Sequence, residues 1–156
     1  MSIEIREFHG RYRFLSNFYP CSIKVEDIEF PSVEHAFQAM KTLNPRIRRN
    51  IALLPTPGKA KQFGRVLQLR EDWDTVRYPI MMELVRQKFT RYGDLAVMLL
   101  DTYPAKLVEG NYWNDTYWGV CNGVGENKLG EILMLVRKEL GKGKDAKWNY
   151  KTHHEI

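Results

Sequence analysis

VEHAFQAMK, residues 33–41, is the stretch on which the fold of this chain depends, because its apolar residues recur with the period of a helix. They share one stripe, at positions i, i+4 and i+7: Val33, Phe37 and Met40. The polar residues have the same spacing and lie on the stripe beside it: Glu34, Gln38 and Lys41. A carboxylate, an amide and an amine therefore line the edge of a face that we expect to be buried.

Two interpretations of this polar stripe are open. In the first, Glu34 lies in the first turn of a helix and Lys41 near its end, where the helix dipole favours each charge. In the second, the stripe lines a cleft, where a carboxylate can activate water or stabilise positive charge at a sugar C1 carbon. An amine among other cations has a lowered pKa and can act as a nucleophile. The spacing is compatible with both.

The basic residues of the chain are concentrated in one segment. Residues 35–70 contain no Asp or Glu and carry eight cations: Lys41, Arg46, Arg48, Arg49, Lys59, Lys61, Arg65 and Arg70. The formal net charge of the whole chain is +5, so the remaining residues are net acidic. Such a segment indicates an anionic partner, with phosphate on a small molecule or on nucleic acid as the first candidate. A solvated basic surface without a ligand is the alternative.

Local signals predict an α+β fold that is mainly helical. Short strands are expected at residues 3–5, 21–25, 28–30 and 105–110, with a hairpin turn at Glu26 and Asp27. Ser32 and Thr56 are the expected N-caps of two helices, and Pro45 is expected to stop or redirect the first of them. Further helices are expected at 46–54, 74–92, 94–103 and 127–140, the last ended by Gly141. These elements predict a single domain over residues 1–141 with short N-terminal β elements, followed by a basic tail at 142–156.

Length and composition restrict the class of protein. A chain of 156 residues with 44% hydrophobic residues fits one globular domain. It lacks an apolar run of about 18 residues and an N-terminal apolar segment after a charged one, so we expect neither a membrane span nor a secretory signal. Cys21 and Cys121 are its two cysteines, and its four histidines lack metal-ligand spacing. These features predict a reduced, cytoplasmic protein without a metal, a cofactor or a membrane partner.

The loop at residues 111–126 is rich in aromatic side chains, carboxamides and glycine. Trp118 lies in this loop beside Asp115, and Asn127 opens the helix that follows. Rings next to carboxamides and a carboxylate can stack on a base and hydrogen-bond a ribose. A turn-rich loop whose tryptophans cap the core is the alternative.

Four blocks of sequence occur in an order that resembles a known family. They are FLSNFYP at 14–20, VEHAFQAMK at 33–41, FGR at 63–65, and DTYWG at 115–119 running into GENKLGEILMLVRKEL at 125–140. They resemble the NADAR superfamily, the YbiA-like N-glycosidases, over residues from about 8 to 140. The resemblance implies a compact α+β fold and hydrolysis of an N-glycosidic bond to ribose. The implied substrates are phosphorylated riboside intermediates of riboflavin biosynthesis or ADP-ribosylated guanine.

The resemblance also implies roles for particular residues. The candidates for catalysis are Glu34, Lys41 and Asp115, and those for substrate binding are Asn17, Phe18, Gly64, Arg65, Trp118 and Asn127. Lys41 is the expected nucleophile, with Glu34 or Asp115 as acid and base, and direct attack by water is the alternative mechanism. Arg65 and the group at 46–49 would hold phosphates, and a base would stack on Phe18 or Trp118.

Two other classes of function compete with the glycosidase. A non-catalytic module would bind ADP-ribose or NAD without cleaving it. A nucleic-acid binder would use the basic segment at 35–70, and ADP-ribosylated nucleic acid is a partner that both this reading and the resemblance allow. The sequence leaves open the true substrate, the choice between the two carboxylates and the oligomeric state.

Overall fold

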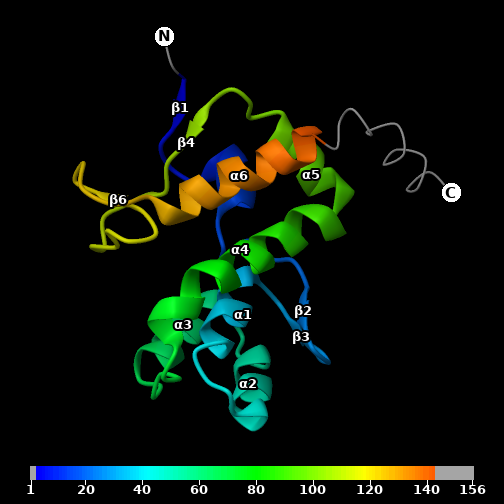
Figure 1. The fold of residues 1–156 in the computed structure, drawn as a ribbon, viewed down its shortest axis with the longest axis vertical. Helices are drawn as coiled ribbons and strands as arrows, with labels where there is room; N and C mark the ends of the chain where they lie inside the picture. Colours follow the sequence, from blue (N-terminus) through cyan, green and yellow to red (C-terminus); the bar gives the residue numbers. More distant parts are fainter. Residues whose placement is uncertain (1–2, 143–156) are drawn as a thin grey trace, which may run out of the picture. The chain divides into compact units, whose positions relative to one another are not determined.

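The computed structural model describes residues 3–142, which form two compact units. Residues 16–88 make one unit, and residues 3–15 together with 89–142 make the other. Helix α4 (Trp73–Arg91) contains the boundary, which lies between Lys88 and Phe89. Helices predominate, and the described strands form three two-stranded sheets, so the predicted α+β class is confirmed (Figure 1).

The unit at 16–88 is built around one short helix. Its elements, besides the first part of α4, are β2 (Ile23–Val25), β3 (Ile28–Phe30), α1 (Val33–Ala39), α2 (Pro45–Ala52) and α3 (Pro57–Arg65). The strands form the predicted antiparallel hairpin, in which Glu26 takes a positive φ of 54° at the turn. Helix α1 contacts α2, α3 and both strands. All of its residues are consequently buried, the polar ones included.

Side-chain caps fix where the helices of this unit begin. The Ser32 hydroxyl accepts a hydrogen bond from the His35 N–H, and the Thr56 hydroxyl accepts one from the Lys59 N–H, each at 3.1 Å. Both predicted caps are confirmed. The prediction for Pro45 was wrong: α1 ends before it, with Met40 as the C-cap, and Pro45 is the first residue of α2 behind the cap Asn44.

Besides the end of α4, the other unit combines small parallel sheets with a 3₁₀ helix and two α-helices. Its elements are β1 (Glu4–Ile5), the 3₁₀ helix η1 (Gly10–Leu15), α5 (Gly93–Leu100), β4 (Lys106–Leu107), β5 (Gly110–Asn111), β6 (Val120–Cys121) and α6 (Lys128–Lys142). β1 pairs with β4 and β5 with β6, both in parallel, and α6 packs on α5 and β4.

The C-terminal helix differs from its predicted end. α6 continues through Gly141 to Lys142, so this glycine does not stop it. Nothing lies within 4 Å of the position that a Gly141 Cβ would take, and the residue keeps helical backbone. The predicted basic tail lies outside the described residues apart from Lys142, and the domain limits 1–141 stay a prediction. Every helix in the described part of the chain is too short or too polar to span a membrane.

Candidate functional site

The polar stripe of α1 is buried rather than solvated. Glu34 is only 7% exposed, and its Oε1 accepts a hydrogen bond of 2.7 Å from the Gln38 side-chain amide one turn later. Lys41, a further turn along, is partly buried. A carboxylate in the core needs hydrogen-bond donors to remain charged, and Gln38 supplies one of them. The stripe therefore places an acid and an amine together on the inner side of one short segment.

Lys41 has a pKa below the usual value of a lysine. Burial of the amine is the largest cause, because it disfavours the charged form. The Glu34 carboxylate opposes this effect and raises the pKa, whereas the cations of Arg65 and Lys61 lower it. Neutral amine is therefore present at a lower pH than for an exposed lysine, which is the condition for nucleophilic attack.

Gly64 allows α3 to approach α1 at this stripe. A Cβ built on Gly64 would lie 1.7 Å from Oε1 and 2.6 Å from Cδ of Gln38, so Gln38 or α3 would have to move to accommodate a side chain there. The next residue, Arg65, is exposed, and its charge acts on Lys41. The FGR block thus meets the VEHAFQAMK block through a close approach that glycine permits with Gln38 in its observed position.

His35 has a structural role within the same block. The residue is 1% exposed, and its two ring nitrogens lie 2.7 Å from the Ser32 hydroxyl and 3.0 Å from the Leu54 carbonyl. A carbonyl can only accept, so Nε2 carries the proton and Nδ1 accepts from Ser32. Burial lowers the pKa of His35, in agreement with a neutral ring. Both nitrogens are occupied, so His35 anchors α1 instead of exchanging protons with a substrate.

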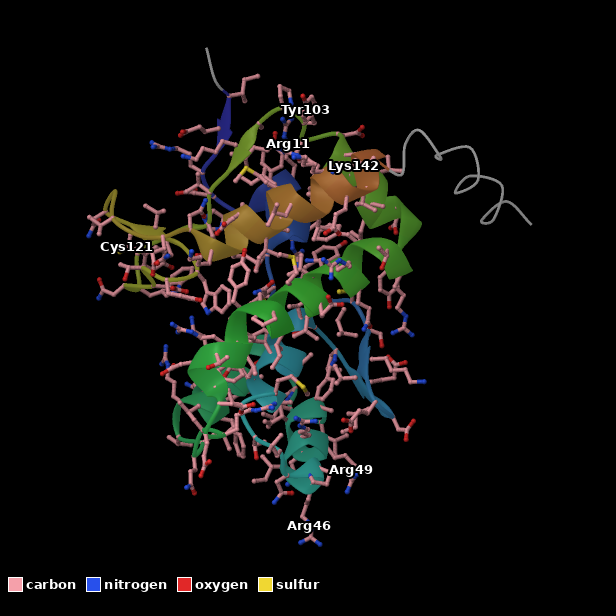
Figure 2. All side chains as sticks on the ribbon, viewed as in Figure 1. Arg11, Arg46, Arg49, Tyr103, Cys121 and Lys142 are labelled. Carbon is pink, nitrogen blue, oxygen red and sulfur yellow. The ribbon has the colours of Figure 1, made fainter. Side chains whose placement is uncertain are left out.

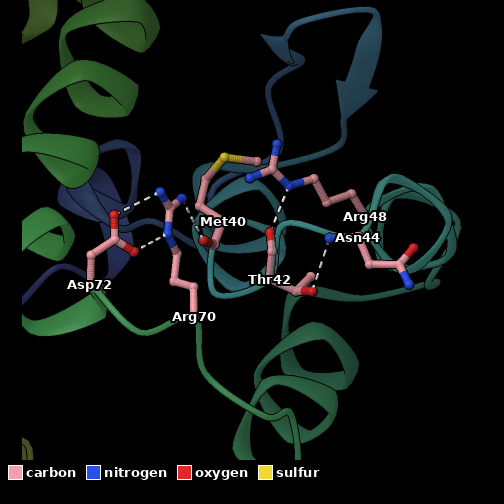
Figure 3. Close-up of polar contacts among 6 residues, drawn as sticks. All are labelled: Met40, Thr42, Asn44, Arg48, Arg70 and Asp72. Atoms are coloured by element: carbon pink, nitrogen blue, oxygen red, sulfur yellow. Dashed lines mark hydrogen bonds and ion pairs between the residues drawn. The ribbon is translucent and has the colours of Figure 1, made fainter.

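The backbone on both sides of Lys41 is held by donors from Arg48 and Arg70 (Figure 3). The Arg70 N–H donates to the Lys41 carbonyl at 2.8 Å, and the Arg70 guanidinium donates to the Met40 carbonyl at 3.4 Å. The Arg48 Nε donates to the Thr42 carbonyl at 2.8 Å. Asp72 binds the Arg70 guanidinium through both oxygens, at 2.6 and 3.1 Å, and so holds it in place. The three successive carbonyls just after α1, those of residues 40–42, are therefore satisfied.

The arginines of α2 divide into two kinds. Arg48 is 7% exposed and its Nε donates to the Thr42 carbonyl, so it cannot serve as a freely accessible phosphate ligand. Arg46 and Arg49 are exposed and project away from α2 (Figure 2). The predicted phosphate-binding group at 46–49 is thus reduced to two side chains. Arg48 is bound to the Thr42 carbonyl in the segment before α2, and no pattern in the sequence predicts that bond.

Asn17 and Phe18 lie in a turn that docks on the start of α1. The Asn17 carbonyl accepts from the Glu34 N–H at 3.0 Å, and the Asn17 amide lies 3.5 Å from the Met81 sulfur. The Phe18 N–H donates to the Ser16 hydroxyl at 3.1 Å, and the Phe18 ring is 42% exposed. An exposed ring on a fixed turn next to Glu34 is available for stacking.

The remaining predicted residues belong to the other unit, where each orders a loop. Asp115 Oδ1 accepts from the Tyr117 and Trp118 N–H groups at 3.2 and 2.9 Å. The Trp118 ring meets the Tyr117 ring edge-on, with centroids 4.7 Å apart. Asn127 accepts from the Glu109 N–H and donates to the Leu107 carbonyl, both at 2.9 Å. The nine predicted site residues therefore form two groups, six in the unit at 16–88 and three in the other.

A cavity that the sequence did not indicate lies in the unit at 16–88. It has a volume of about 680 Å³ and is lined by residues between Thr42 and Ile47 and by residues 67–72. Its walls include Arg70 and Asp72, the pair that holds the backbone next to Lys41. Residues that line the cavity therefore also hold the backbone next to Lys41 in place.

Comparisons with known proteins find relatives over most of this chain. An N-glycosidase YbiA of Shigella sonnei is 42% identical over 132 residues, 83% of this chain and 82% of that protein. A riboflavin biosynthesis protein of Vibrio vulnificus is 40% identical over 137 residues, 86% of this chain and 36% of that longer protein. The NMR structure of the Escherichia coli protein YbiA has a TM-score of 0.81 at 38% identity and covers 92% of this chain and 89% of its own. The NADAR domain model matches residues 6–141, and this chain belongs to the NADAR domain family.

Proposed function

We propose that this protein is an N-glycosidase that hydrolyses the bond between ribose C1 and a base nitrogen in a phosphorylated riboside. One observation carries the proposal: a buried carboxylate, Glu34, and a partly buried amine of lowered pKa, Lys41, lie on one segment beside cationic residues. The names of the relatives from Shigella and Vibrio, an N-glycosidase and a riboflavin biosynthesis protein, support both the reaction and the class of substrate.

Cleavage of a ribosyl C–N bond passes through a transition state that resembles an oxocarbenium ion. Positive charge develops at C1 as the base leaves, and a carboxylate in a water-poor site stabilises that charge more strongly than water would. Glu34 is placed for this role, because the Gln38 amide fixes one of its oxygens at 2.7 Å. The same carboxylate can take the proton of the attacking group.

We propose Lys41 as the nucleophile. Its neutral amine donates an electron pair to C1 while the C1–N bond breaks, and the proton that Glu34 takes from the amine passes to the departing base. Opening of the sugar ring gives a Schiff base between Lys41 and ribose, and addition of water then releases the sugar and regenerates the amine. The charges of Arg65 and Lys61 favour this step, because they lower the pKa of Lys41.

Binding of the substrate draws on three further side chains in this proposal. Arg65 is exposed next to the Lys41 segment and offers a guanidinium for the phosphate. Phe18 offers a ring for the base. Asp115, whose Oδ1 holds the loop at Trp118, is proposed to shape that loop, and Asp115→Asn tests its predicted role as a second acid or base.

Release of free base from three substrates tests the proposal: a phosphoribosylamino-pyrimidine, NAD, and ADP-ribosylated guanine in DNA. Wild type is compared with Lys41→Ala, Glu34→Gln and Asp115→Asn, and with the exposed control Lys59→Ala from the same unit. We expect release from the first substrate that is lost in the Lys41 and Glu34 variants and retained in the control. Borohydride should trap a sugar adduct on wild type but not on Lys41→Ala.

Two results would contradict the proposal. Tight binding of ADP-ribose without release of any base would identify a binding module instead of an enzyme. Release that persists in Lys41→Ala, without a trapped adduct in wild type, would replace the covalent step by direct attack of water.

A further inference from the structure

Lys88 is a buried lysine that the reaction described above does not use. It lies in α4 within the unit at 16–88 and is 1% exposed. Its Nζ donates to the Ser16 carbonyl at 2.8 Å and lies 5.4 Å from the centre of the Tyr19 ring. Burial lowers the pKa of Lys88 to about 8, and the thiol of Cys21 opposes that shift. A buried amine is energetically unfavourable, and an apolar residue of similar length would commonly be as stable.

The carbonyl that Lys88 binds belongs to the turn that carries two predicted substrate-binding residues. The Ser16 carbonyl also accepts from the Tyr19 N–H at 3.1 Å, which closes the turn. Within it, the Asn17 carbonyl accepts from the Glu34 N–H at 3.0 Å. Lys88 therefore bonds to Ser16, and the next residue of the turn, Asn17, bonds to the backbone of Glu34, the proposed catalytic acid.

We propose that Lys88 is a positioning residue that fixes the turn at 16–19 and thereby aligns Asn17, Phe18 and the Glu34 backbone for substrate. The expected effect of Lys88 on catalysis rests on the proposed function. Its effect on the turn at 16–19 does not, because the hydrogen bonds of the turn exist without substrate. A lysine suits this task, because its ammonium group brings three donors on a long stem to the Ser16 carbonyl.

Amide hydrogen exchange without substrate tests the structural part. In Lys88→Met we expect the Tyr19 and Glu34 amides to exchange about tenfold faster, the effect of losing one hydrogen bond to a charged group. The Met40 amide, which donates to Ala36 and Phe37 within α1, serves as the internal reference and should be unchanged. Arg86→Met is the matched control, because it removes a partly exposed cation, which is ion-paired with Glu83, from the same helix two residues away.

A measurement on wild type keeps the inference testable if Lys88→Met does not fold. The Lys88 ammonium should give a slowly exchanging NMR signal with a scalar coupling to the Ser16 carbonyl carbon. Absence of that coupling overturns the inference. So does unchanged exchange of the Tyr19 and Glu34 amides in a folded Lys88→Met.

Kinetics test the second part. For the phosphoribosylamino-pyrimidine, KM in Lys88→Met should rise about tenfold and kcat should fall by less than KM rises, with recovery of most of the loss in Lys88→Arg. The dissociation constant of ribose 5-phosphate should rise by the same factor. Equal loss of kcat and kcat/KM with normal binding would overturn the positioning role. Failure of wild type to release any base, with the exchange results as expected, would refute the proposed function and leave the role of Lys88 in the turn supported.

Discussion

Replacement of Gly64 by alanine tests the contact that joins α3 to the polar stripe of α1. The new methyl group would lie 1.7 Å from Oε1 and 2.6 Å from Cδ of Gln38, so one of the two elements must move. If α3 moves, a packed helix interface is strained. If Gln38 rotates away, its hydrogen bond of 2.7 Å to Glu34 is lost.

Each of these responses has a known order of magnitude. Overpacking of a core costs about 1–3 kcal/mol, and loss of a hydrogen bond to a carboxylate costs about 1.5–3 kcal/mol. Alanine offsets up to about 1 kcal/mol, because it is a better helix former than glycine. We expect Gly64→Ala to lower the free energy of unfolding by about 1–2 kcal/mol, with a fall in Tm of about 2–4 °C for each kcal/mol.

Denaturant unfolding of Gly64→Ala beside Gly58→Ala measures this effect. Gly58 lies in the first turn of the same helix, where an added Cβ would meet only the Thr56 hydroxyl, at 3.8 Å. The control should therefore keep or slightly increase its stability. In addition, Gly64→Ala should lose activity, because the rotated Gln38 no longer fixes Glu34. A Gly64→Ala protein as stable as Gly58→Ala would refute the close approach of the two helices.

Three further predictions concern charges and caps. Arg65→Gln should raise the pKa of Lys41, because it removes a cation that lowers it; NMR titration of the Lys41 side chain checks this, and the rise of activity with pH should move to higher pH. Asp72→Asn should make the free energy of unfolding less dependent on pH below about 4. Arg70 lowers the pKa of Asp72 in the folded protein, so the Asp72 carboxylate stabilises the fold at any pH above its pKa in the unfolded chain. That stabilisation is lost as the pH falls through the pKa of Asp72 in the folded protein. Unfolding curves between about pH 2 and 6 measure this, and equal slopes for both proteins would contradict it. Ser32→Ala should lower the free energy of unfolding by about 1 kcal/mol through loss of the α1 cap, whereas an unchanged denaturation midpoint would show that the cap contributes nothing.

Local chemistry made the starts of helices predictable from the sequence. Ser32 and Thr56 bond to backbone groups three residues later, so their role can be derived from neighbouring residues alone. The end of α1 could not be derived in this way. The carbonyls of residues 40–42, just after the helix, accept from Arg48 and Arg70, and Arg70 is distant in sequence, so the chain leaves the helix without glycine or proline.

The same distinction applies to the candidate site. Glu34 and Lys41 were accessible to sequence analysis, because their helical spacing and their block of sequence indicated them. Lys88 was missed, although it had a signal: it lies on the helical stripe of α4 that contains Met81 and Leu84, at i+7 and i+4 from them. A lysine on an apolar stripe indicates a buried amine that must find an acceptor, but the identity of that acceptor, Ser16, is fixed by tertiary structure.

The bond between Lys88 and Ser16 has a topological consequence. Ser16 is the first residue of the unit at 16–88 and Lys88 is the last. The bond of 2.8 Å between the Lys88 Nζ and the Ser16 carbonyl oxygen places the two ends of that unit within the reach of one lysine side chain. A segment whose two ends lie close together can be replaced by a homologous segment, or circularly permuted, without displacing the flanking chain. Residues 16–88 can therefore be exchanged as one segment between relatives. Recombination at its two ends would keep together the carbonyls, amides and charges that surround Lys41.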